Sequence, residues 1–67
     1  MIRHKLKYLR SKYEMTQEDV AAKTNIDYRR YSRLERGEIE FTIYDAIRLQ
    51  KVLKRKSIND LLEDEEL

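Results

Sequence analysis

TQEDVAAKTNIDYRRYSRLERG, residues 16–37, is the stretch of sequence that decides the fold, because it predicts two short helices joined by a sharp turn. Thr16 and Asp19 form a capping-box-like pair at the start of the first helix, where the hydroxyl oxygen can accept a hydrogen bond from an unpaired backbone N–H. Asn25 suits the turn, since asparagine enters the left-handed region of backbone space more readily than most residues. Asp27 is the expected N-cap of the second helix.

The second helix of this pair has two unlike faces. At about 100° per residue, one side of residues 28–36 is polar and rich in arginine, whereas the opposite side is largely apolar. The polar side comprises Tyr28, Arg29, Ser32, Arg33 and Arg36. Tyr31 and Leu34 lie on the apolar side, and Gly37 is expected to end the helix in left-handed geometry. A helix that is anchored on one face and rich in arginine on the other is suited to the major groove of double-stranded DNA.

These residues carry a resemblance to a known family. The segment resembles the helix-turn-helix of the phage repressor and Cro family, also called the xenobiotic-response-element or lambda-repressor-like family, and the resemblance spans about residues 6–62. It rests on Thr16-Gln17-Glu18-Asp19-Val20-Ala21, then Ile26, and then Tyr31-Ser32-Arg33-Leu34-Glu35-Arg36-Gly37. It implies an all-α fold, a compact bundle of five short helices in which the second and third form the helix-turn-helix. It further implies a sequence-specific, double-stranded DNA-binding transcriptional regulator, with repression as the expected role.

The resemblance also implies which residues read bases. In this family the first turn of the recognition helix, and the residue one turn later, contact base edges in the major groove. These places are occupied by Tyr28, Arg29, Ser32 and Arg33. Arginine presents a planar fork that matches O6 and N7 of guanine, and tyrosine can pack against a thymine methyl group. Contact with phosphate alone is the alternative for each of them.

Contacts with the DNA backbone are expected from a second set of residues. This set comprises Gln17, Lys23, Asp27, Arg30 and Arg36. Gln17 opens the first helix of the pair, where the family places a glutamine on the phosphate backbone beside helix N–H groups. For Lys23, Arg30 and Arg36, plain solvation of the side chain is the alternative.

Three further helices are predicted outside this pair. They are expected over residues 2–12, over residues 43–54, and, as a short last helix, around Ile58, Leu61 and Leu62. Thr42 with Asp45, and Ser57 with Asp60, repeat the capping-box-like pattern at the starts of the last two. Residues 63–67 are expected to form a frayed acidic tail.

The family resemblance also bears on the packing of these helices and on the turns between them. It implies a largely buried ion pair between Arg10 and Glu35, which joins the first and third helices. It also marks departures from the family pattern: Glu14 and Asn25 occupy turn positions where glycine is common, and Gln50 replaces a small apolar residue. Strain or an altered turn is expected at Glu14 and Asn25.

Length and composition indicate one small helical domain, residues 1–67. The chain has no cysteine, no proline, one glycine and 42% charged residues, which favours helices and excludes disulfides and thiolate–zinc sites. No apolar run approaches the roughly 18 residues of a membrane span and no signal peptide opens the chain, so we expect a cytoplasmic protein of bacterial or phage origin without a membrane partner. No nucleophile–base set, glycine-rich phosphate loop or metal-ligand cluster is present in the sequence. We therefore expect no enzyme activity, no catalytic or metal site, no cofactor and no small-molecule ligand.

Charge is unevenly distributed along the chain. Residues 1–37 hold ten Lys or Arg against five Asp or Glu, a net charge of +5, whereas residues 38–67 hold five against eight, a net charge of −3. The basic half contains the arginine-rich helix, so its expected partner is a polyanion such as DNA. A solvated basic helix face is the alternative interpretation.

A homodimer is expected, at least on DNA, because one domain covers one half-site. Dimers of this motif class bind pseudo-palindromic operators whose half-site centres lie about 10 bp apart. The connector before the fourth helix, together with the last two helices, offers Ile39, Phe41, Ile43 and Leu62 for pairing. The alternative function is an antitoxin-like or other protein-interaction module that binds a partner through its acidic second half and uses DNA binding only secondarily.

Overall fold

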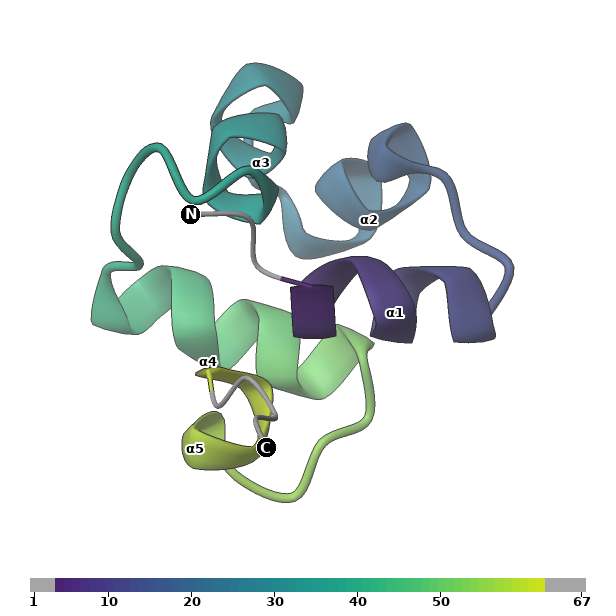
Figure 1. Ribbon diagram of the computed structural model, residues 1–67, viewed down its shortest axis with the longest axis vertical. Coiled ribbons are helices and arrows are strands. Elements are labelled where there is room, and N and C mark those ends of the chain that lie inside the picture. Colours follow the sequence, from purple (N-terminus) through teal and green to yellow (C-terminus); the bar gives the residue numbers. More distant parts are fainter. Residues whose placement is uncertain (1–3, 63–67) are drawn as a thin grey trace.

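Residues 4–62 of the protein are described by a computed structural model, and within this range the chain forms helices and no strand (Figure 1). The helices are α1 (His4–Lys12), α2 (Gln17–Thr24), α3 (Tyr28–Glu35), α4 (Ile43–Val52) and α5 (Ile58–Leu62). The prediction of a compact, all-helical fold is confirmed. Its count of five helices holds only in part, since α1 to α4 have eight to ten residues each and α5 has five, little more than one turn. The predicted acidic tail, residues 63–67, lies outside the described residues.

The helices pack around a shared apolar core. In Figure 1, α2 and α3 lie above α4, and α1 contacts both α3 and α5. The buried apolar residues are Leu6, Leu9, Val20, Ala21, Ile26, Tyr31, Leu34, Ala46, Leu49, Leu53 and Leu61. Burial of each leucine side chain stabilises the fold by about 1.5–3 kcal/mol. The orientation of α3 is therefore set mainly by its packing on this core.

Capping boxes start α2 and α4, as the sequence predicted. Thr16 Oγ1 accepts a hydrogen bond from the Asp19 N–H at 3.0 Å, and Asp19 Oδ2 accepts one from the Thr16 N–H at 2.8 Å. Thr42 and Asp45 make the same two bonds, at 3.1 and 2.9 Å. An N-cap of this kind stabilises a helix by about 1 kcal/mol, so both helix starts are determined locally.

Asp60 ties α5 to the rest of the molecule. Its N–H donates to Ser57 Oγ at 3.3 Å, which is one of the two bonds of the predicted third capping box. Its carboxylate lies 3.6 Å from Lys5 Nζ and 3.6 Å from Arg55 Nη1. α5 is thus linked to α1 and to the connector that precedes it.

Left-handed residues follow each of the first four helices. Glu14, Asn25 and Lys54 have φ of 57°, 59° and 57°, and Gly37 has φ of 75°. This geometry costs a residue that carries a Cβ about 1–2 kcal/mol, and asparagine tolerates it best. Gly37 and Asn25 therefore behave as predicted, Glu14 adopts the strained turn that its position suggested, and the turn at Lys54 had no signal in the sequence.

α4 ends at Val52, two residues before the predicted boundary. Leu53 caps the helix and Lys54 turns into the left-handed region, which stops it there. Gln50 Nε2 donates a hydrogen bond to the backbone oxygen of Arg55 at 2.7 Å. The amide of Gln50 thereby holds the connector to α5, which explains a polar residue where the family pattern has a small apolar one.

Candidate nucleic-acid interface

One face of α3 is open to solvent and carries aromatic and cationic side chains. Tyr28 is 45% exposed, and the side chains of Arg33 and Arg36 are 54% and 53% exposed. Arg29 is exposed as well. Together with Ser32, these residues line a shallow hollow of about 290 Å³. The arginine-rich face that the helical period predicted is therefore present on the surface.

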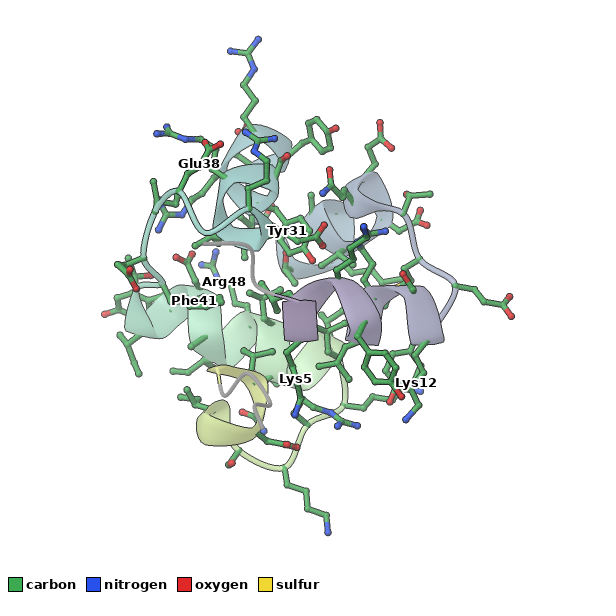
Figure 2. All side chains as sticks on the ribbon, viewed as in Figure 1. Lys5, Lys12, Tyr31, Glu38, Phe41 and Arg48 are labelled. Atoms are coloured by element: carbon green, nitrogen blue, oxygen red, sulfur yellow. The ribbon has the colours of Figure 1, made fainter. Side chains whose placement is uncertain are left out.

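The opposite face of α3 is buried. Tyr31 and Leu34 have no exposed surface, and Figure 2 shows Tyr31 in the interior of the molecule. The helix ends at Glu35, one residue earlier than predicted, and Arg36 is its C-cap. Burial of this side determines which side chains of α3 reach solvent.

Asp27 starts α3 as its N-cap. Its Oδ2 accepts hydrogen bonds from the N–H groups of Arg29 and Arg30, at 3.0 and 3.3 Å. Asp27 is also among the predicted phosphate contacts, but an ionised carboxylate has no hydrogen to donate and repels a phosphate. Its place in the site is therefore that of a capping residue.

A buried polar network holds α3 to α1 and α2. Glu35, 4% exposed, accepts hydrogen bonds from Arg10 Nε at 2.8 Å and from Arg10 Nη2 at 3.0 Å. It also accepts from Gln17 Nε2 at 2.6 Å and from the Tyr31 hydroxyl at 2.8 Å. A further nitrogen of Arg10, Nη1, donates to the backbone oxygen of Met15 at 3.1 Å. The Arg10–Glu35 ion pair implied by the family resemblance is thus confirmed.

The protonation states of this network follow from its contacts. Burial acts to raise the pKa of Glu35, but the hydrogen bonds that it accepts outweigh burial and hold its pKa below the ordinary value of 4.5. Burial, and then the charge of Glu35, raises the pKa of the Tyr31 hydroxyl well above 10.0. The hydrogen bond to Glu35 raises the pKa of Arg10. At neutral pH, therefore, Glu35 is ionised and its partners are all donors.

α2 supplies two of the predicted phosphate contacts, Gln17 and Lys23. Gln17 is half-buried, and its bond to Glu35 links the start of α2 to the end of α3. A primary amide carries two N–H groups, so Gln17 retains a donor for a second acceptor. Lys23 is exposed in the last turn of α2.

Arg30 bridges α3 and α4. Its Nε donates to Asp45 Oδ1 at 3.3 Å, and its Nη2 donates to Asp45 Oδ2. Burial acts to raise the pKa of Asp45, but the hydrogen bonds from Arg30 and Thr42 outweigh it and hold that pKa below 3.8. The sequence placed Arg30 among the phosphate contacts and did not indicate this bridge, so a phosphate would have to share the guanidinium with Asp45.

Ser32 is covered by a neighbouring side chain. It is 7% exposed, and its Oγ accepts a hydrogen bond from Arg36 Nη1 at 2.8 Å. The helical period assigns Ser32 to the polar face, as predicted, but it does not show that a long side chain one turn later lies over it. In this structure Ser32 supports Arg36 and is not open to a base.

Glu38 belongs to this surface, although it is not among the site residues predicted from the sequence. Its Oε2 accepts a hydrogen bond from Arg36 Nε at 2.8 Å, and its Oε1 accepts one from Arg36 Nη2 at 3.3 Å. Its Oε1 also lies 3.5 Å from Arg33 Nε. The hydrogen bond from Arg36 holds the pKa of Glu38 below 4.5. The signal in the sequence that could have indicated this contact is an acid two residues after Arg36, the C-cap of α3.

Two other kinds of site have no counterpart in the described part of the chain. Residues 4–62 contain no helix that is long and apolar enough to cross a membrane. Among the same residues, no three His, Cys, Asp or Glu are grouped so that they could hold a metal ion.

Comparison with known proteins gives a match to a protein family. A protein-family model described as helix-turn-helix matches residues 6–61. No curated protein and no solved structure matches the chain. The matched range begins in α1 and ends in α5, so it includes the α2–α3 pair and the Arg10–Glu35 ion pair.

Proposed function

The chain belongs to the lambda-repressor/Cro-like helix-turn-helix family, and we propose that it is a sequence-specific regulator of transcription that binds double-stranded DNA and acts as a repressor. The observation that carries this proposal is the two-sided placement of α3. The side of α3 that carries Tyr31 and Leu34 is buried, whereas Arg29 and Arg33 are exposed to solvent. An α-helix with its side chains is about 10–12 Å across, which fits the roughly 12 Å width of the major groove.

Tyr28, Arg29 and Arg33 are the proposed base readers. The contact of Arg33 with Glu38 uses Nε, which leaves Nη1 and Nη2 to donate to O6 and N7 of a guanine. Tyr28, in the first turn of α3, can pack its ring against a thymine methyl group. Ser32 contributes to this surface by holding Arg36.

The proposed phosphate contacts surround these base readers. Gln17 offers its remaining N–H, and Lys23 and Arg36 offer charge. Arg30 is a weaker candidate because Asp45 engages its guanidinium. Each phosphate contact contributes about −0.9 to the slope of log affinity against log salt concentration, so binding is expected to weaken steeply as salt rises.

We propose that two copies act together on a pseudo-palindromic operator, with half-site centres about 10 bp or 34–36 Å apart. The Cα body of one copy measures 30 × 23 × 22 Å, dimensions of the same order as this half-site spacing. α4 offers an apolar surface for this contact, since Ile43 and Tyr44 are 58% and 69% exposed. Of the other residues expected there, Ile39 and Phe41 are half-buried, and the Leu62 side chain lies outside the described part of the structure.

Selection of binding sites from random duplex DNA tests this proposal most fully. We expect recovery of a motif with two-fold symmetry and half-site centres about 10 bp apart. The recovered duplex should bind more tightly than random duplex in a gel shift.

Absence of a shift with any duplex at low salt would refute the proposal. That result would favour the alternative function, a protein-interaction module that binds a partner through the acidic second half of the chain. Recovery of a single half-site without symmetry would retain DNA binding and refute the dimer.

A further inference from the structure

Glu38 lies on the connector after α3, beside the arginines proposed to face DNA (Figure 2). Its carboxylate binds the Nε and Nη2 groups of Arg36 together, while Arg36 Nη1 donates to Ser32. All three nitrogens of this guanidinium therefore donate to oxygens of the protein before any DNA arrives. Arg33 is engaged less closely, with its Nε 3.5 Å from Glu38 Oε1.

A carboxylate that binds an arginine fork at two nitrogens resembles a DNA phosphate in charge and geometry. A phosphate that binds the same Nε–Nη2 edge of Arg36 must replace Glu38, and the carboxylate left beside it is repelled by the DNA. Only the second N–H groups of Nη1 and Nη2 stay available while Glu38 is bound. The pair is half-exposed, with side-chain exposures of 53% and 46%. Exposed ion pairs are weak, so this replacement is feasible, but it opposes binding to any duplex whatever its sequence.

Competition between Glu38 and DNA phosphates affects binding to operator and to non-operator DNA to different extents. Phosphate contacts supply almost all of the free energy of binding to non-operator DNA. The cost of releasing Arg36 from Glu38 is therefore a large fraction of that binding free energy. On an operator, Arg33 can donate to guanine through Nη1 and Nη2 while its Nε stays near Glu38. Base contacts therefore compensate for the release of Arg36 only on the correct sequence.

We propose that Glu38 is a specificity-determining residue, which competes with DNA phosphates for Arg36 and Arg33 and so weakens binding to non-operator DNA more than binding to the operator. The inference rests on the proposed function, because it requires α3 to face DNA. It assigns the connector residue a role in recognition that does not depend on contact with a base.

The experiment compares wild type with Glu38→Gln and with Glu14→Gln. Glutamine keeps the shape of the side chain and removes its charge. Glu14 is exposed in the turn after α1, so its variant makes the same change in net charge without touching the arginines of α3. Each protein is titrated by fluorescence anisotropy against random duplex and against the selected operator, over a salt series that starts at about 50 mM.

We expect E38Q to bind random duplex about three- to tenfold more tightly than wild type. Its operator affinity should rise by less, so the ratio of operator to random affinity falls. The salt slope on random duplex should steepen by about 0.9, the contribution of one added phosphate contact. In an Arg36→Gln background, the gain from E38Q should shrink toward the gain seen for E14Q.

Three outcomes would overturn the inference, and they differ in what else they overturn. If E38Q matches E14Q on both duplexes while wild type binds the operator, Glu38 has no role in specificity and the proposed function stands. If E38Q loses operator affinity and its affinity for random duplex is unchanged, Glu38 positions Arg33 and does not compete with phosphate. If neither wild type nor E38Q binds any duplex at low salt, with circular dichroism showing both folded, the proposed function falls as well.

Discussion

Replacement of Arg10 by methionine tests the network that holds α1 to α3. The Arg10 guanidinium donates two hydrogen bonds to Glu35 and one to the backbone oxygen of Met15. Methionine keeps most of the aliphatic stem and removes the charge and all three bonds. The buried Glu35 carboxylate then retains Gln17 and Tyr31 as donors but loses its cation.

The expected loss is about 3 kcal/mol in the free energy of unfolding. Removal of one partner from a buried ion pair costs about 3–5 kcal/mol, and the two remaining donors place this case at the lower end. At about 0.05–0.15 kcal/mol per residue, a domain of this length has a total stability of about 3–10 kcal/mol. Arg10→Met therefore removes about a third of the stability or more, and the Tm should fall by about 12 °C or more.

The assay is urea unfolding followed by far-UV circular dichroism. With an m-value of about 1 kcal/mol per molar urea, the midpoint should fall by about 3 M. Lys7→Met is the matched control, because Lys7 lies exposed on the same helix. Its change in unfolding free energy should stay within about 0.5 kcal/mol.

The pH dependence identifies the cause of the loss. In the wild type the pKa of Glu35 lies below 4.5, so the stability that its charge contributes is present above about pH 4.5 and is lost as the pH falls through the folded pKa. Without Arg10, burial raises the pKa of Glu35, so the charged carboxylate destabilises the fold at neutral pH and protonation relieves it. The difference between the two proteins is therefore largest near neutral pH and shrinks below about pH 4.

A loss no larger than that of Lys7→Met would refute this account of Glu35 as a buried charge held by Arg10. A loss independent of pH would refute it equally. The double variant Arg10→Met with Glu35→Gln removes the unpaired charge, so it should be more stable at neutral pH than Arg10→Met alone.

Three further predictions concern the arginines of α3 and the apolar surface of α4. Arg33→Ala should cost about 1–3 kcal/mol of operator affinity and relax the preference at one base position, measured on operators with single-base changes; an equal loss on every duplex would make Arg33 a backbone contact. Arg30→Ala should lower the free energy of unfolding by about 1–3 kcal/mol in thermal unfolding, since Asp45 is left buried without its cation, and an unchanged Tm would contradict this. Ile43→Ser with Tyr44→Ser should raise the dimer dissociation constant on operator DNA about tenfold or more in sedimentation, while the unfolding midpoint changes little; an unchanged constant would place the dimer contact elsewhere.

Local signals predicted the α2–α3 pair, because the interactions that set its ends act over a few residues. The capping box of Thr16 and Asp19 and the left-handed turn at Asn25 depend only on neighbours in the sequence. The helical period in turn assigned Tyr31 and Leu34 to the core. These features can therefore be predicted from the sequence without knowledge of the tertiary structure.

Contacts between residues that are far apart in the sequence could not be predicted in this way. The Arg30–Asp45 bridge depends on the angle between α3 and α4, which core packing sets. The cover of Ser32 by Arg36, and the contact of both arginines with Glu38, depend on side-chain conformations at the end of a helix. The Arg10–Glu35 pair was expected from the family resemblance, since neither residue carries a local signal of the other.

The most direct measurement of whether the open face of α3 reads DNA is an isotope-edited NOE spectrum of the labelled protein bound to the selected operator. Contacts from the side chains of Tyr28, Arg29 and Arg33 to base protons in the major groove are the expected result. Contacts confined to α4 and α5, or a complex in which the resonances of α3 do not change on binding, would contradict the account.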